Sequence, residues 1–89
     1  MSMDSDPAAL MSRRIFRLDL SVEAVSLYLL CCALADNGQP VPSERVAGAW
    51  NGTPADLRRA AAELQSLAIV ETADTGGYRV NAESRWRLP

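Results

Sequence analysis

A strongly apolar stretch runs from Ala24 to Ala35 and is interrupted by one polar residue, Ser26. Its twelve residues fall short of the roughly 20 that span a bilayer as a helix. Ser21 can cap a helix and Glu23 falls in its first turn, so the sequence predicts a helix that begins near Val22. We expect it to end at residues 37 and 38, an Asn-Gly pair. A helix that is apolar on nearly every side must be covered by its own domain or by a partner.

The composition of the whole chain limits the size of the domain that contains this helix and the functions that the domain can have. A chain of 89 residues predicts one small domain, and nine basic against eleven acidic residues give a net charge of −2, so any contact with DNA must be local. Histidine is absent and the two cysteines, Cys31 and Cys32, are adjacent in the apolar stretch. We therefore expect no enzyme, no metal site, no cofactor and no disulfide framework. Residues 1–14 are expected to form a flexible tail without a secretion signal, and the protein is expected to be cytoplasmic, with no membrane partner.

Two further helices are predicted from local signals. Pro40 and Pro42 force Val41 into an extended conformation, which leaves room for a short edge strand at most. Ser43 is then expected to cap a helix of about two turns over ERVAGAW, which breaks at an Asn-Gly turn. The sequence TPAD over residues 53–56 combines a capping threonine, a proline at the first helical position and an acid at the third, and it predicts the start of the third helix.

The remaining residues predict a hairpin and a core. Residues 69–72 and 78–81 favour strands, and ADTGG between them supplies a turn. The domain is expected to cover residues 15–83, with residues 84–89 as a C-terminal tail that carries Trp86. The expected core consists of Leu27, Leu30, Leu34, Val46, Leu57, Leu64, Leu67, Ile69 and Val80.

Three helices, the last two joined by a tight turn, followed directly by a hairpin, resemble a winged helix-turn-helix domain. The resemblance covers roughly residues 19 to 81 and rests on LSVEAVSLYLLCCALAD, SERVAGAW, TPADLRRAAAELQSLAIVE and GGYRV, as in modules of bacterial and phage transcriptional regulators and replication-initiation proteins. It implies an α+β fold, a three-helix winged helix-turn-helix with a two-stranded β-hairpin wing. It also implies that the third helix enters the major groove of double-stranded DNA while the wing contacts the neighbouring backbone.

Carried over by position, the resemblance implies a groove-facing side made of Thr53, Ala55, Arg58, Arg59 and Ala62. Arg58 and Arg59 are then the expected DNA-reading residues, because a guanidinium can bind guanine or phosphate through two parallel hydrogen bonds. The wing would add Thr75, Gly76, Gly77 and Arg79. The alternative for the two helix arginines is a solvated face with Asp56 or Glu63 as salt-bridge partner.

Two hypotheses of function follow. The first is sequence-specific DNA binding by a regulator or replication-associated module, as a homodimer. The second is a winged helix that binds a protein, as an adaptor subunit or a phage-type inhibitor of a nucleoprotein complex, because the chain is acidic and the first helix has surplus apolar surface. In either case we expect spare apolar surface on that helix, with Ala24, Tyr28, Cys31, Cys32 and Ala35 as candidates for its uncovered side. The segment Ile15 to Leu20 or the tail around Trp86 can cover this side, within the chain or from a second copy. We predict cover by a second copy, in a symmetric dimer.

Overall fold

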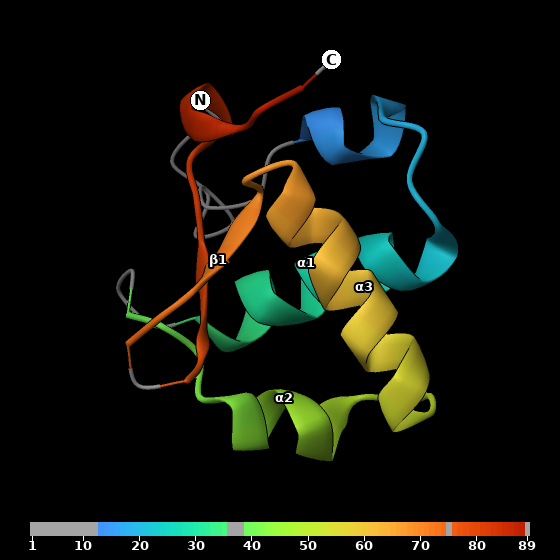
Figure 1. Cartoon of the computed structure of the whole chain (residues 1–89), viewed down its shortest axis with the longest axis vertical. Coiled ribbons are helices and arrows are strands. Elements are labelled where there is room, and N and C mark those ends of the chain that lie inside the picture. Colours follow the sequence, from blue (N-terminus) through green and yellow to red (C-terminus); the bar gives the residue numbers. More distant parts are fainter. Residues whose placement is uncertain (1–12, 36–38, 75, 89) are drawn as a thin grey trace, which may run out of the picture.

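The expected α+β class is confirmed. A computed structural model describes residues 13–35, 39–74 and 76–88, and within them three α-helices precede a two-stranded antiparallel hairpin, with a short 3-10 helix at either end (Figure 1). In chain order the elements are η3 (Arg13–Arg17), α1 (Val22–Leu34), α2 (Ser43–Ala49), α3 (Pro54–Ser66), β1 (Val70–Thr72), β2 (Tyr78–Val80) and η4 (Glu83–Arg85).

Helix α1 begins where its capping signal predicts. The Ser21 Oγ accepts a hydrogen bond from the Ala24 amide at 3.1 Å, which satisfies one of the free N–H groups of the first turn. The described part of the helix ends at Leu34, with an extended Ala35 as its C-cap. The Asn-Gly stop predicted at residues 37 and 38 lies outside the described residues.

The chain itself covers the strip of α1 that was expected to be free. Ala24, Tyr28 and Cys31 are fully buried, so the expectation that they are uncovered is wrong, whereas Cys32 and Ala35 are partly buried. The cover comes from both ends of the described chain, since Ile15 of η3 is fully buried and Trp86 is 8% exposed in the same cluster. The Trp86 ring meets the Tyr28 ring edge to face, at 5.9 Å between centroids, and its indole N–H donates to the Asn81 carbonyl at 3.1 Å.

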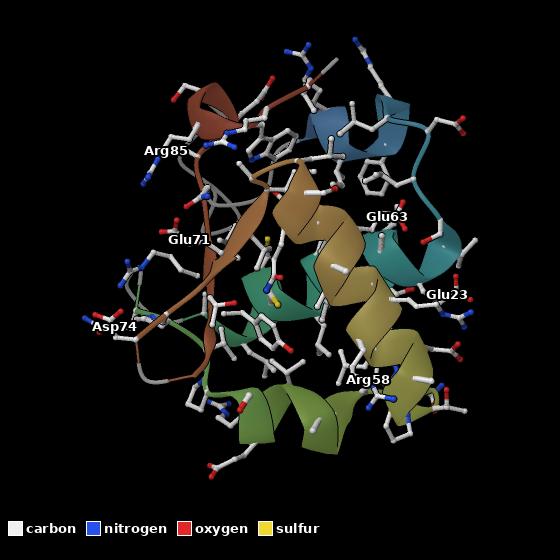
Figure 2. All side chains as sticks on the ribbon, in the orientation of Figure 1. Glu23, Arg58, Glu63, Glu71, Asp74 and Arg85 are labelled. Carbon is white, nitrogen blue, oxygen red and sulfur yellow. The ribbon has the colours of Figure 1, made fainter. Side chains whose placement is uncertain are left out.

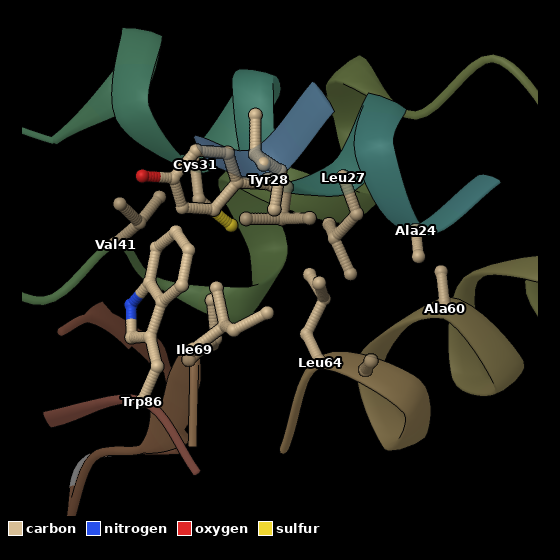
Figure 3. Packing of buried hydrophobic residues seen from close by; sticks show 13 residues of the cluster. Ala24, Leu27, Tyr28, Cys31, Val41, Ala60, Leu64, Ile69 and Trp86 are labelled. Carbon is tan, nitrogen blue, oxygen red and sulfur yellow. The ribbon is translucent and has the colours of Figure 1, made fainter. Parts of the chain in front are cut away.

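The core forms where α1 crosses α3. Figure 3 shows Ala24 opposite Ala60, where two small side chains let the helices approach closely, and Leu27 beside Leu64. All nine expected core residues belong to this packing. Leu27, Val46, Leu64 and Ile69 are buried, and the five others are partly buried against the cluster: Leu30, Leu34, Leu57, Leu67 and Val80.

Of the N-terminal caps predicted for the other two helices, one is confirmed and one is wrong. The α3 prediction is confirmed: Thr53 Oγ1 accepts from the Asp56 amide at 3.1 Å and Pro54 is the first helical residue. The predicted Ser43 cap is wrong, because Ser43 is already inside α2. Pro42 occupies the N-cap position and makes no side-chain hydrogen bond, so α2 begins without a side-chain cap.

The hairpin pairs Val70 with Val80, Glu71 with Arg79 and Thr72 with Tyr78. The predicted short edge strand is reduced to one residue, Val41, which exchanges two backbone hydrogen bonds with Tyr78, at 2.7 and 2.8 Å. The prolines on either side of Val41 cannot donate, which limits the pairing to this single bridge.

Helix α3 ends in a left-handed turn at Ala68, with φ of 58°. The Ala68 amide donates to the Gln65 carbonyl and the Ile69 amide to the Leu64 carbonyl, both at 3.0 Å, which is the Schellman arrangement. The Asn81 side chain holds this turn from the hairpin, since its Nδ2 donates to the Ala68 carbonyl at 2.8 Å. The turn therefore fixes how α3 passes into β1.

We expect Leu64→Ala to lower the free energy of unfolding by about 2–5 kcal/mol, because it leaves a cavity where α3 meets α1. Urea denaturation measures this. The control is Val22→Ala on the exposed side of α1, where Val22 is 77% exposed and the change should stay within about 0.5 kcal/mol. Equal effects of the two variants would contradict the packing described.

Two glycines should respond in opposite directions to alanine. A Cβ on Gly77 would overlap the Val41 carbonyl oxygen and lie 2.9 Å from its carbon, so Gly77→Ala should destabilise by about 1–3 kcal/mol. Gly48 lies in α2 with nothing within 4 Å of an added Cβ, so Gly48→Ala should stabilise by about 0.5–1 kcal/mol. Thermal unfolding of both variants measures the difference; a Gly77→Ala protein as stable as the parent would rule out the Val41 bridge.

Candidate nucleic-acid interface

The outer face of α3 is free of packing, as the sequence predicts. Its buried residues, Ala60, Ala61 and Leu64, lie against α1, while the expected groove-facing set is exposed: Thr53, Ala55, Arg58, Arg59 and Ala62. The small side chains of Ala55 and Ala62 leave the helix backbone accessible to a large partner. Thr53 uses its Oγ1 as the helix cap, and its hydroxyl proton can still be donated.

The two arginines on this face are in different states. Arg59 forms an ion pair with Asp56, one helical turn earlier, and the Arg59 hydrogen bond, followed by that of Thr53, lowers the pKa of Asp56. The Arg59 side chain is 77% exposed, so an ion pair of this kind stabilises little. No carboxylate of the described residues lies within salt-bridge distance of Arg58, which Figure 2 shows beside the first half of α3. The salt-bridge alternative therefore holds for Arg59 and fails for Arg58.

Glu63 is not a partner of these arginines. Its carboxylate accepts two hydrogen bonds from Ser21, at 3.0 Å from the backbone amide and 2.7 Å from the hydroxyl. A negative charge at the N-terminus of α1 also suits the helix dipole. Glu63 thus joins the start of α1 to the middle of α3.

One of the residues expected to contact DNA from the wing, Arg79, forms an ion pair within the hairpin. Arg79 Nη1 lies 3.7 Å from Glu71 Oε2 across the two strands. Thr75 lies outside the described residues. Gly76 has a φ of +90° and Asp74 is exposed beside it, at the tip of the hairpin in Figure 2. The described part of the wing therefore presents an arginine that is already partnered.

Positive charge gathers at a place that the sequence analysis did not single out. The 3-10 helix η3 and the C-terminal segment lie together at the end of the molecule opposite α2 (Figure 1), joined by an ion pair of 3.0 Å between Arg14 and Glu83. We call this surface the basic pole and define it as Arg14, Phe16, Arg17, Arg85 and Arg87, all of which are exposed. The motifs RRIFR and RWR were the available signal, but only the fold brings them together.

The described residues also form a cleft of about 400 Å³ between the start of α1 and the turn that joins α2 to α3. Glu23 and Asp56 supply carboxylates there, and Trp50 supplies a ring whose N–H donates to the Thr53 carbonyl at 3.1 Å. Among the described residues, no three histidine, cysteine or acidic side chains are grouped to hold a metal ion.

The expected interface residues Tyr28, Cys31 and Trp86 are core residues instead. Burial raises the pKa of the Cys31 thiol to about 12 and that of Cys32 to about 11, so neither is a reactive thiolate near neutral pH. Within the described ranges, no helix has the length and apolar character needed to cross a membrane.

Comparison with known proteins found no family model, no curated protein and no solved structure that matches this chain.

The contact between Ser21 and Glu63 can be measured by a double-mutant cycle. We expect Ser21→Ala and Glu63→Ala each to lower the free energy of unfolding by about 1 kcal/mol, because each removes two hydrogen bonds at the α1 N-terminus. The double variant should lose less than the sum, with a coupling of at least about 0.5 kcal/mol by urea denaturation. Strictly additive losses would show that the two side chains do not interact.

Proposed function

We propose that the protein is a winged helix-turn-helix domain that binds double-stranded DNA through α3. The order of three helices and a hairpin supports this, with α2 and α3 joined by a short turn and the hairpin directly after α3. The observation that carries the proposal is the outer face of α3, where Arg58 lies between the small residues Ala55 and Ala62 and has no carboxylate partner among the described residues. A helix with such a face can approach the floor of the major groove.

In this proposal Arg58 reads a base edge or binds phosphate. Its guanidinium is exposed, and no ion pair with a carboxylate of the described residues has to break before it binds. Arg59 exchanges Asp56 for a phosphate, and the high exposure of the Arg59 side chain keeps the free-energy cost of breaking the ion pair small. The hydroxyl of Thr53, at the N-terminus of α3, is placed to donate to a phosphate oxygen. Arg79 belongs to the wing contact.

Homodimerisation remains part of the proposal, because one domain of this size offers limited contact area and two half-sites would double it. Ala24, Tyr28 and Cys31 of the expected strip cannot serve as the interface, because this chain buries them. Phe16 and Val22, at 58% and 77% exposure, are the large apolar side chains that the described surface leaves open.

A second candidate function, binding of a protein partner, is favoured by the cleft between α1 and the turn from α2 to α3. Its two carboxylates and the Trp50 ring suit a lysine or arginine side chain of a partner, through charge and cation–π attraction. Retention of the protein on immobilised duplex DNA at low salt separates the two functions. DNA binding through α3 requires retention, whereas binding of a protein partner does not.

Changing Arg58 and Arg59 together to alanine should weaken binding to duplex DNA and leave the fold intact, because both side chains are exposed. Each lost phosphate contact should also reduce the slope of log Kd against log salt concentration by about 0.9. Fluorescence anisotropy with a labelled duplex of mixed sequence measures both quantities, and circular dichroism checks the fold.

The matched control is Arg45→Ala, which removes an exposed arginine of α2 rather than of α3. It should bind DNA like the parent protein. If the double variant also binds like the parent, α3 is not the helix that enters the groove.

A further inference from the structure

The arginines of the chain are divided unevenly between the basic pole and the rest of the surface. Among the side chains that the structure describes, four arginines lie at the pole: Arg14, Arg17, Arg85 and Arg87. Two carboxylates belong to the same end of the molecule, Asp19 and Glu83, and Glu83 is engaged by Arg14. The remaining described residues carry four arginines and six carboxylates. The pole is therefore the positive end of an acidic protein.

We propose that the basic pole is a second nucleic-acid contact, which holds the phosphate backbone beside the helix that enters the groove. The proposal deepens the proposed function and rests on it for the placement of the duplex. Guanidinium groups suit this task, because each presents a planar fork of N–H donors to a phosphate and remains charged at every physiological pH. The exposed ring of Phe16 lies between Arg14 and Arg17 in sequence and adds an apolar contact for a sugar.

The pole is continuous with the outer face of α3. A cleft of about 310 Å³ is lined by Gln65 of α3, by Glu71 and Thr72 of β1, and by Arg87 of the C-terminal segment. The Arg87 amide donates to the Leu67 carbonyl at 2.6 Å, just after α3, which fixes the backbone of the C-terminal segment against the end of that helix. Arg87 thus extends the row Ala55, Arg58, Ala62 and Gln65 beyond the end of the helix.

The distance along α3 from Arg58 to the end of the helix matches the width of the major groove. Arg58 lies about two turns before the end of α3 at Ser66, which is roughly 12 Å of helical rise. The major groove of B-DNA is also about 12 Å wide. With Arg58 near one side of the groove, the end of α3 lies near the phosphates of the other side, and the backbone of Arg87 is fixed against this end. Figure 2 shows Arg85 directed outward at this end of the molecule, away from the core.

Three of the pole arginines form no ion pair within the described residues that would give them a role in holding the fold together. No carboxylate of the described residues lies within salt-bridge distance of Arg17, Arg85 or Arg87, and all three side chains are exposed. Arg87 contributes to the fold through its backbone amide alone, so its side chain can be changed without loss of that hydrogen bond. Arg14 is left unchanged in the test because its ion pair with Glu83 joins the two segments.

The test uses the single variants Arg17→Gln, Arg85→Gln and Arg87→Gln in the full chain, with Arg45→Gln as the control that removes the same charge at the opposite end. Anisotropy titration with a labelled duplex of mixed sequence, at several salt concentrations, gives the salt slope. Each pole variant should reduce the slope by about 0.9 and the triple variant by nearly three times as much, whereas Arg45→Gln should leave it unchanged. Pole variants with the parent slope would overturn the proposal.

The α3 variant Arg58→Ala, Arg59→Ala separates this inference from the proposed function. If it weakens DNA binding and the pole variants do not, the pole proposal fails while the function of α3 stands. If the pole variants weaken DNA binding and the α3 variant does not, the pole is the DNA contact and the proposal that α3 enters the major groove fails. Binding of polyglutamate without any binding of duplex DNA would overturn both and assign the pole to an acidic protein.

Discussion

The enclosure of α1 is the constraint on which the rest of the structure depends. Its residues are apolar on nearly every side, so each neighbouring element is placed where it removes part of this surface from water. Ala60 and Leu64 of α3 pack against α1 together with Val41, Ile69 and Trp86 (Figure 3). Ile15 belongs to the same buried cluster. The buried side chains of α3 are engaged in this contact, and that is why its opposite face, with Arg58, is exposed.

Local signals were sufficient to predict the elements, because caps and turns act within a few residues. Ser21 and Thr53 both accept the hydrogen bonds that their positions suggest. Ser43 shows the limit of such signals, since Pro42 starts the helix one residue earlier and no side chain caps it. The segments that cover α1, around Ile15 and Trp86, could be named from the sequence, but the prediction that they come from a second copy was wrong. The contact of Trp86 with Tyr28 joins parts of the chain that are far apart in sequence, so no local signal shows that it forms within one chain.

The same distinction applies to the arginines of the candidate site. The pair of Arg59 with Asp56 follows from helical spacing and could be weighed from the sequence. The pair of Arg79 with Glu71 requires the register of the hairpin. The pair of Arg14 with Glu83 joins residues 69 positions apart and requires the whole fold. For this reason the sequence placed positive charge on α3, whereas most of the unpaired arginines at the described surface lie elsewhere.

The position of Trp86 has a consequence for how the protein is made. During synthesis α1 leaves the ribosome early, but the ring that covers Tyr28 belongs to one of the last segments of the described chain to emerge. Until then a strongly apolar helix lacks part of its cover, and an exposed apolar surface of this kind promotes aggregation and attracts chaperones. The domain therefore reaches its native packing only near the end of translation of this region, as one cooperative unit rather than helix by helix.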